Sequence, residues 1–581
     1  MTIDPERVTY FGETDSRNKR VKFGIKSKDR LKHVYVIGKT GMGKSTLLEN
    51  MAIQDIQNGE GLAFVDPHGK SADLLLKYVP EERVKDVVYF APFDTEFPVS
   101  FNVMEDVGPS KRHLVVSGLM SAFEKIWVDA WSSRMAYILQ NTLSALLEFP
   151  DATMLGINRM LSDKTFRNKV VDHITDPTVK SFWVDEFANY TERFAAEATP
   201  AIQNKVGQFV NNAMIRNIIG QPESSFDIRK VMDERKILIV NLSKGLVGET
   251  NAKLLGGMII TKIYLAAMSR ADSNEAELNK LPNFYLYVDE FQSFANKSFA
   301  DILSEARKYK LNLTIAHQYI EQMEEEVRDA VFGNVGTMIT FRVGAFDAEV
   351  LEKEFAPTFT AQDLVNLGAF QMYLKLMIDS VTSQPFSASS LNHVIERVEP
   401  SLYDKIMDSS RKQFAKPRTE VEKAIQEWHD EGKIAPPSRS SSASSPRRET
   451  ERRSSPVPPI GQGRAGRTST TRPERYERRD EPKPIDIRGK KEDIKYKKPE
   501  PPPMPVEEEF KPLKTISLDD LKKKENNQRK PDEKHVADLR NALKAVVGEV
   551  KTMPKNTPPT SPPPEKKGPN PDELKKILNG E

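Results

Sequence analysis

The chain has 581 residues, a formal net charge of +2 at pH 7 and no cysteine. This length is enough for two or three domains, and the lack of cysteine excludes disulfides, cysteine-ligated zinc, iron–sulfur clusters and thiol catalysis. The amino-terminal stretch lacks the basic and apolar regions of a signal peptide, and no run of about 18 apolar residues predicts a membrane span. We therefore expect a cytoplasmic protein that meets a membrane only through a partner.

Charge and proline are distributed unevenly along the chain. Residues 435–581 contain 34 Lys and Arg against 24 Asp and Glu, and they hold 24 of the 39 prolines, whereas residues 1–434 carry a net charge of −8. A basic, proline-rich segment of this kind cannot bury enough apolar surface to fold. We expect a folded acidic body followed by a disordered tail at 435–581, with a possible short helix at 530–550.

The body begins with a strand or loop segment, residues 1–32, and then alternates strand and helix signals. Apolar strands such as HVYVIG and GLAFVD, separated by helical patterns, predict the first part of a parallel α/β domain at 33–108. Residues 109–220 show helical spacing alone and predict an inserted all-α domain. The α/β pattern resumes at 221–392, where LLGGMIITKIYLAAM predicts an amphipathic core helix, and 393–434 predicts a helical extension.

The strand HVYVI leads directly into GKTGMGKST, which fits the Walker A pattern GxxxxGKS/T of a phosphate-binding loop. Glycines in such a loop let backbone N–H groups close around phosphate oxygens at the positive end of the next helix. Lys44 would place its charge on the β- and γ-phosphates, and Ser45 would offer a hydroxyl to Mg²⁺. The sequence predicts an ATP–Mg²⁺ site, and its expected nucleotide-binding residues are Gly38, Lys39, Thr40, Gly41, Met42, Gly43, Lys44, Ser45 and Thr46.

The tetrapeptide VDEF occurs twice, at 184–187 and at 288–291. Only the second copy follows five apolar or aromatic residues, FYLYV, as a buried Walker B strand requires. A lysine and a serine interrupt any strand before the first copy, which we interpret as a solvated helix face. We expect Asp289 to hold Mg²⁺ and Glu290 to act as the catalytic group that polarises the attacking water.

Three candidate strands separate the phosphate loop from the Walker B strand along the chain, which favours a RecA-like core over a kinase or GTPase. The next apolar strand, LNLTIAH, ends at Gln318, whose amide could sense the γ-phosphate or be an ordinary polar strand end. Arg307 precedes that strand and could serve a neighbouring subunit's site as an arginine finger, or be a solvated helix residue. Arg342 and Arg216 are the other finger candidates.

An ordered set of motifs resembles a known group of ATPases. GKTGMGKSTLL, FVDPHGK, VNLSKG, YVDEFQSFA, SEARKYKLNLTIAHQ and FRVGAFDAEVLEKEF are similar to the FtsK–HerA superfamily, above all to the TraD/TraG-type coupling proteins of type IV secretion and their soluble HerA-like relatives. The resemblance covers about residues 20–392. It implies a hexameric ATPase with nucleotide at subunit interfaces, DNA in a central channel, an inserted all-α domain, and the residue roles given above.

The same resemblance leaves two points open. Asp66 and His68 of the DPHG segment match a family motif to which we attach no mechanism. Membrane-anchored coupling proteins begin with transmembrane helices, and the sequence predicts none here. We therefore expect a cytosolic DNA motor or a pump recruited by a membrane or secretion partner.

Because the body is acidic, DNA binding would depend on local basic groups. Lys244 in LSKG and Lys297 in FANKS could form a positive collar in a ring of six, or be ordinary surface lysines. Ten arginines between Arg447 and Arg479 could bind phosphates, form a linker or recruit an acidic protein. The leading hypothesis is an ATP-driven hexameric DNA translocase. The alternatives are a protein-secretion ATPase that delivers or unfolds protein, and a nucleotide-dependent scaffold with negligible turnover.

Overall fold

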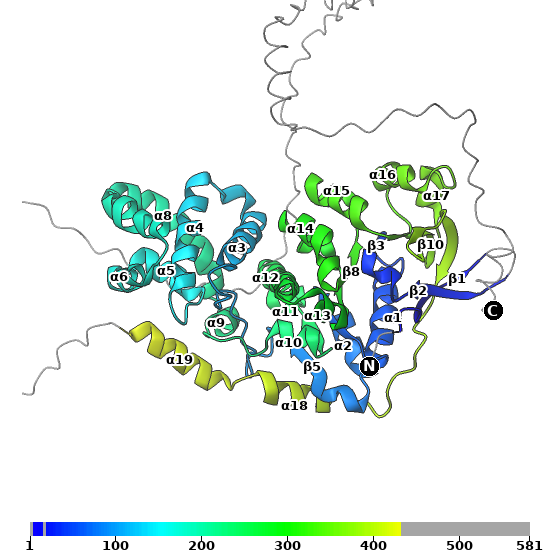
Figure 1. Ribbon diagram of the computed structural model, residues 1–581, viewed down its shortest axis with the longest axis horizontal. Helices are drawn as coiled ribbons and strands as arrows, with labels where there is room; N and C mark the ends of the chain where they lie inside the picture. The colour runs from blue at the N-terminus through cyan, green and yellow to red at the C-terminus, as the bar shows by residue number, and fades with distance from the viewer. Residues whose placement is uncertain (1–3, 16–18, 432–581) are drawn as a thin grey trace, which may run out of the picture. The chain divides into compact units, whose positions relative to one another are not determined.

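The computed structural model describes residues 4–15 and 19–431, which are drawn as coloured ribbon in Figure 1. The predicted tail at 435–581, its possible helix at 530–550 and its arginines lie outside the described residues. The last three residues of the predicted extension, 432–434, lie outside them as well.

A mixed sheet of eleven strands forms the centre of the described structure, in the order β2-β1-β13-β10-β9-β3-β8-β7-β4-β6-β5. Its strands are β1 (Val8–Thr14), β2 (Lys22–Lys26), β3 (Val34–Ile37), β4 (Gly61–Asp66), β5 (Val87–Phe90), β6 (Ile237–Asn241), β7 (Phe284–Val288), β8 (Leu311–His317), β9 (Thr337–Thr340), β10 (Gln371–Lys375) and β13 (Phe386–Ser390). A separate antiparallel ribbon pairs β11 (Met377–Ile378) with β12 (Val381–Thr382).

The seven strands from β9 to β5 are parallel, and the four at the other edge are antiparallel. The predicted α/β class is therefore confirmed. One strand, β8, lies between the phosphate-loop strand β3 and the Walker B strand β7, which is the RecA-like order. The three strands that separate the two motifs along the sequence, β4, β5 and β6, lie on the far side of β7. The RecA-like prediction was therefore correct, but the strand that lies between the motifs in space is a different one.

Both faces of the parallel strands are buried, because successive side chains along a strand point to opposite faces. In β7, Phe284, Leu286 and Val288 join one hydrophobic cluster, whereas Tyr285 and Tyr287 join the other. Helices α1 (Lys44–Gln57) and α2 (Lys70–Leu75) cover the tyrosine face. The opposite face is covered by α12 (Glu249–Met268), α14 (Ser298–Glu305) and α15 (Glu325–Asn334).

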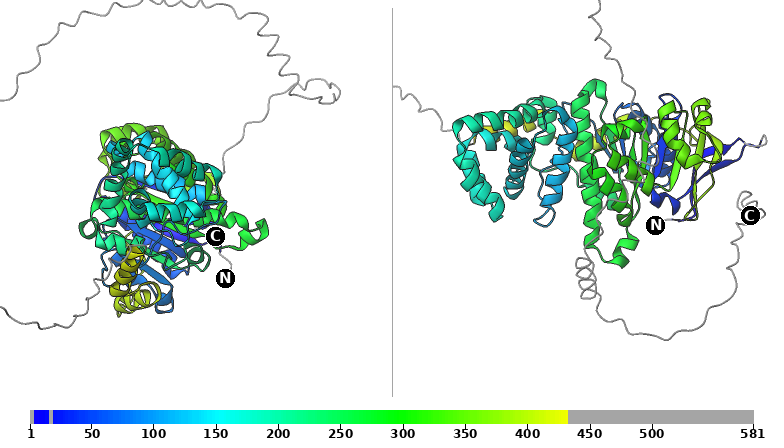
Figure 2. Two further views of the ribbon diagram at one scale, coloured as in Figure 1. Left: turned by 90° about the vertical axis from the view of Figure 1, so that its left-hand side faces the viewer. Right: turned by 90° about the horizontal axis from the view of Figure 1, so that it is seen from above.

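From Arg112 to Ile219 every element that the structure describes is helical, within the stretch predicted as an insertion. The helices are α3 (Arg112–Ile126), α4 (Ser133–Glu148), α5 (Leu155–Ser162), α6 (Lys164–His173), α7 (Pro177–Ser181), α8 (Glu192–Val210) and α9 (Ala213–Ile219), with a π-helical turn at Phe182–Glu186 and a 3₁₀ turn at Phe187–Asn189. They lie to one side of the sheet, with α12 between them and the strands (Figures 1 and 2). The predicted domain boundaries stay predictions.

Helix α12 is more deeply buried than an amphipathic helix would be. Its buried residues are spread around the helix, because the sheet side covers one face and α3 packs on another. Glu249–Asp272 is the one helical segment, in the part of the chain that the structure describes, long and apolar enough to cross a membrane, and 56% of its apolar window is buried in the fold. The predicted core position of this helix is thus confirmed, whereas its predicted amphipathic character is not, since α3 covers a second face.

The remaining helices pack around the sheet or connect the sheet to the helical region. Around the sheet are α10 (Ile228–Asp233), α11 (Lys244–Val247), α13 (Glu275–Lys280), α16 (Ala345–Phe355) and α17 (Ala361–Asn366). Helices α18 (Tyr403–Phe414) and α19 (Arg418–Asp430) run from strand β5 to the helical region, as the lower edge of Figure 1 shows. Ser410 accepts a hydrogen bond from Tyr89 N–H at 2.9 Å, and Arg159 donates to Trp428 O at 2.8 Å. These bonds tie α18 to the sheet and α19 to the helices.

Candidate nucleotide site

The phosphate loop connects β3 to α1 at the carboxyl edge of the parallel strands. Gly41 has φ 76° and Gly43 has φ 118°, which only glycine adopts without strain. A Cβ added at Gly43 would come within 2.9 Å of the Phe370 ring, and Phe370 N–H donates to Met42 O at 3.0 Å. The loop is therefore shaped by its own glycines and by the chain that follows α17.

Lys44 points into this loop. Its Nζ donates to Gly38 O at 2.7 Å and to Lys39 O at 3.1 Å. Burial lowers the pKa of Lys44, while the carboxylates of Asp289 and Glu290 act in the opposite direction and favour the ammonium form. An ammonium held by loop carbonyls at the start of α1 is suitably placed for the phosphates of a nucleotide.

Ser45 and Asp289 meet across the gap between α1 and β7. Ser45 Oγ donates to Asp289 Oδ2 at 2.8 Å, and Asp289 is almost fully buried. Burial raises the pKa of Asp289, which Lys44 and the Ser45 hydrogen bond oppose. Among the described residues no group of three or more His, Asp or Glu could hold a metal ion by itself. The pair of hard oxygen donors fits Mg²⁺, which commonly takes one or two carboxylates and completes its shell with phosphates and water.

Glu290 follows β7 in the left-handed conformation, with φ 46° and ψ 50°. Its Oε1 lies 2.8 Å from His68 Nε2, and its Oε2 lies 2.6 Å from Lys244 Nζ. The hydrogen bond from His68 is the main cause that lowers the pKa of Glu290 to about 2, and the Lys244 ammonium adds to it. The carboxylate is thus held on both oxygens by groups that the sequence did not connect with it.

Asp66 and His68 acquire physical roles in the fold. Asp66 Oδ1 accepts from His68 N–H at 2.7 Å and Oδ2 from Ala72 N–H at 2.9 Å, so the buried carboxylate shapes the turn between β4 and α2. That turn delivers the His68 ring to Glu290, which raises the pKa of His68. The DPHG motif was the signal for these residues in the sequence, although their partner could not be read from it.

Gln318 lies at the end of β8, beside the phosphate loop. Its Nε2 donates to Thr40 Oγ1 at 2.7 Å, and the backbone of the same strand accepts a hydrogen bond from Gly38 N–H through His317 O at 3.2 Å. A group bound in the loop would therefore be adjacent to the Gln318 amide. This contact is compatible with the predicted sensing role, which stays a prediction.

The arginine candidates lie in different places. Arg307 is exposed on the turn before β8, at the amino edge of the sheet, and its charge helps burial lower the pKa of His33, which precedes β3, to about 4. Arg342 follows β9 at the phosphate-loop edge, where its carbonyl accepts from Lys39 N–H at 2.8 Å. Arg216 lies on α9 in the helical region. Within one chain, only Arg342 lies beside the site.

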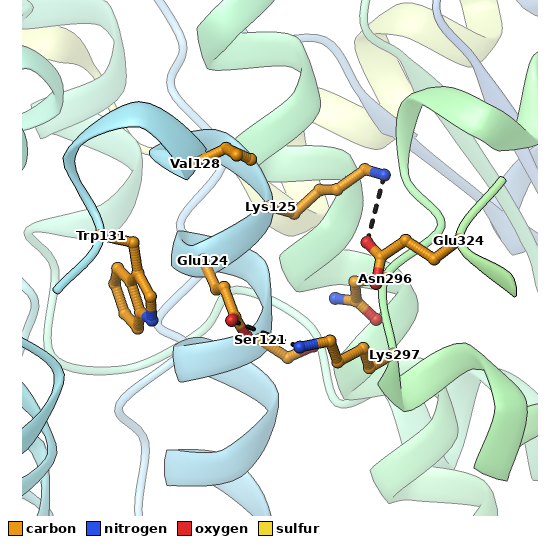
Figure 3. A pocket seen from close by; sticks show the side chains of 8 residues that line it. All are labelled: Ser121, Glu124, Lys125, Val128, Trp131, Asn296, Lys297 and Glu324. Carbon is orange, nitrogen blue, oxygen red and sulfur yellow. Dashed lines mark hydrogen bonds and ion pairs between the residues drawn. The ribbon is translucent and has the colours of Figure 1, made fainter. Parts of the chain in front are cut away.

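The two lysines predicted as DNA contacts are both engaged in ion pairs. Lys244 pairs with Glu290, and Lys297 Nζ lies 3.3 Å from Glu124 of α3. Lys297 belongs to a cleft of about 360 Å³ between α3 and the segments that follow β7 and β8, which Figure 3 shows with its ion pairs. The cleft lining consists of Ser121, Glu124, Lys125, Val128, Trp131, Asn296, Lys297 and Glu324. This cleft separates the helical region from the Walker B loop and is distinct from the phosphate loop.

Comparisons with solved structures found partial likenesses. The bacterial conjugative coupling protein TrwBdeltaN70, unbound, is 15% identical, with 65% of this chain and 90% of that chain covered at a TM-score of 0.48. TrwB in complex with ADP and Mg²⁺ is 14% identical over 65% and 89%, at 0.47. VirB4 of Thermoanaerobacter pseudethanolicus is 11% identical over 68% and 98%, at 0.46. With every one of these scores below 0.5, the strand order and the phosphate loop remain the basis for the fold.

A comparison with curated protein sequences gave no match. A family model described as the TraM recognition site of TraD and TraG matches residues 283–354. The match begins at the Walker B strand β7 and includes β8, β9 and most of α16, so it coincides with the acidic and amide groups of the site. Residues 283–354 are thus similar to this part of TraD and TraG, while the Walker A loop and the RecA-like strand order define the P-loop fold of the chain.

Proposed function

We propose that this protein hydrolyses ATP to move DNA, as a ring-forming motor of the coupling-protein type, and hands the DNA to a secretion or membrane partner. The observation that carries the proposal is the hydrogen bond between Ser45 of the Walker A motif and Asp289, which precedes Glu290, at one edge of the sheet. The TraD/TraG family match over the same strands supports DNA transfer related to type IV secretion.

The chemistry follows from the positions of the side chains. Loop N–H groups and Lys44 would bind the β- and γ-phosphates, while Ser45 and Asp289 would hold Mg²⁺, which neutralises charge on the phosphates when it is bound. Glu290 would accept a proton from the attacking water as general base. Gln318, already bonded to Thr40 of the loop, would report loss of the γ-phosphate.

The finger arginine bears on oligomerisation. Arg307 lies at the sheet edge opposite its own phosphate loop, so it can complete a catalytic site only in a neighbouring subunit. We propose a homo-oligomer, a hexamer in keeping with the family resemblance, in which Arg307 acts in trans. Mixing Arg307→Ala with Lys44→Ala subunits tests this, because each subunit retains what the other lacks. Recovered turnover in the mixture is expected, and no recovery would favour Arg342 acting in cis.

An accessory partner is also proposed. The matched segment corresponds to a region described for TraD and TraG as a TraM recognition site. In this chain its strands are buried, so a partner would contact the helices α14, α15 and α16 on the outside. We propose a cytoplasmic location for the motor, next to such a partner.

Steady-state phosphate release by the full chain, with and without DNA, tests the proposed function, with Lys44→Ala as the inactive control. We expect ATP turnover that DNA stimulates several-fold, and a mass with bound ATP that corresponds to a ring. Turnover stimulated by a secreted protein but not by DNA would support a protein-secretion ATPase. Absence of turnover would support a nucleotide-dependent scaffold.

A further inference from the structure

The carboxylate of Glu290 is held between two cationic side chains that come from different loops. His68 reaches it from the turn after β4, and Lys244 reaches it from α11, directly after β6. Lys244 Nζ also lies 3.3 Å from Ser293 Oγ, in the Walker B loop itself. Lys244, His68 and Glu290 thus follow three neighbouring parallel strands, β6, β4 and β7, and meet at the carboxyl ends of these strands.

This arrangement restrains the proposed base. A general base must have an oxygen free to take a proton from the attacking water. Here both oxygens of Glu290 accept charge-assisted hydrogen bonds, which are the stronger kind. The Glu290 side chain is thus held at both ends of its carboxylate by the two ion pairs.

Lys244 reaches Glu290 from a short helix that is partly exposed. Its helix α11 has four residues and begins after Ser243, and a Cβ at the neighbouring Gly245 would meet open space. Leu246, on the same short helix, is exposed, and the Lys244 side chain is 24% exposed. An anionic polymer passing this edge could therefore reach the Lys244 ammonium. The His68 side chain is 55% exposed, and Asp66 anchors the backbone of the turn that carries it.

We propose that Lys244 is a positioning residue that restrains Glu290, and that a DNA phosphate releases the glutamate by competing for the Lys244 ammonium. His68 then remains on the other oxygen and keeps the carboxylate in place beside the phosphate loop. The proposal rests on the proposed function and adds a coupling between DNA and hydrolysis. In this exchange the ion pair between Lys244 and Glu290 is replaced by an ion pair between Lys244 and a DNA phosphate.

The decisive variant is Lys244→Met, which keeps the length of the side chain and removes its charge. In the absence of DNA, turnover is expected to rise roughly 3- to 10-fold because one oxygen of Glu290 becomes free to accept a proton from water, while the KM for ATP is unchanged. The ratio of turnover with DNA to turnover without DNA falls towards one. Lys244→Arg restores a low DNA-free rate, and Lys253→Met, which removes a lysine paired with Glu249 on α12, is the matched control.

A second readout concerns DNA itself. Binding of a mixed-sequence oligonucleotide, single-stranded and duplex, is measured by anisotropy at several salt concentrations in a Glu290→Gln background. Lys244→Met is expected to reduce the salt dependence of the DNA affinity, because one phosphate contact is lost. Lys253→Met is expected to leave it unchanged. An unchanged salt dependence in Lys244→Met would overturn the competition by DNA.

The outcomes separate the coupling from the proposed function. If wild type hydrolyses ATP but DNA never stimulates it, the DNA motor fails, and a rise for Lys244→Met still supports the restraint. If DNA stimulates wild type and Lys244→Met shows a lower DNA-free turnover that Lys244→Arg restores, then Lys244 assists Glu290, and the restraint is wrong. Equal thermal unfolding midpoints for the variants exclude misfolding as the cause.

Discussion

The tetrapeptide Val-Asp-Glu-Phe lies in two different surroundings in this chain. At 288–291 it ends the buried strand β7, whereas at 184–187 it lies in the π-helical turn and the 3₁₀ turn that follow α7. Val288 is 0% exposed and Val184 is 49% exposed. The first three side chains are therefore buried or partly buried beside the candidate nucleotide site in one copy and exposed in the other, whereas the phenylalanine is buried in both.

The acidic residues differ in the same way. Asp289 and Glu290 bond Ser45, His68 and Lys244, which follow three other strands of the sheet, β3, β4 and β6. Asp185 accepts from Ser181 Oγ at 2.8 Å, four residues before it in the chain, and Glu186 accepts from two exposed tyrosine hydroxyls. The carboxylates of the second copy thus contact groups that follow three other strands of the sheet, whereas those of the first copy contact side chains of the helical region.

Glu290→Gln tests this contrast with the largest effect. Removal of the proposed general base is expected to lower ATP turnover about 10²- to 10⁴-fold. Phosphate release under saturating ATP measures it, and retained nucleotide binding shows that the loop is intact. Glu186→Gln is the paired control and should match wild type. If instead Glu186→Gln abolishes turnover, the two copies have been assigned in the wrong order.

The second test compares the stability contribution of a buried carboxylate behind β7 with that of an exposed carboxylate in the first VDEF copy. Arg30 is fully buried behind β7, where it bonds both oxygens of Asp55 at 2.7 and 2.8 Å and donates to the Tyr287 hydroxyl at 2.6 Å. Asp55→Ala would leave this guanidinium buried without its partner, which costs about 3–5 kcal/mol. Chemical denaturation is expected to show that loss in the free energy of unfolding. Asp185→Ala should stay within about 0.5 kcal/mol of wild type, as surface substitutions usually do.

The valines sharpen the comparison of burial. Val288→Ala removes two buried methyl groups and leaves a cavity, and we expect a loss of about 2 kcal/mol in the free energy of unfolding. Val184→Ala removes the same atoms from an exposed position, where a change within about 0.5 kcal/mol is expected. Equal losses at the two sites, measured by the same denaturation experiment, would contradict the burial difference.

The smallest effect is expected at the tyrosines that hold Glu186. Tyr137 and Tyr190 donate their hydroxyls to Glu186 at 2.9 and 2.7 Å near the surface. Their replacement by Phe should alter the free energy of unfolding by no more than about 0.5 kcal/mol, since water replaces the lost bonds. Turnover is expected to be unchanged. A loss of turnover in Tyr137→Phe would mean that this copy communicates with the nucleotide site.

Several features followed from the sequence because they depend on local patterns. Glycine spacing after an apolar strand located the phosphate loop, and the five apolar residues before Asp289 distinguished β7 from the first copy. Helical spacing also marked the segment that contains α3 to α9. Each of these signals is set by neighbours a few residues apart, which is the range over which helix and strand periodicity operates.

Other features were decided by tertiary structure alone. The placement of β8 between β3 and β7, the burial of α12 beneath α3, and the position of Arg307 at the amino edge depend on how distant segments pack. His68 and Lys244 were visible as residues, yet their shared bond with Glu290 exists only because β4, β6 and β7 are neighbours in the sheet. Strand order arises from long-range burial and pairing, and a single sequence carries no local signal for it.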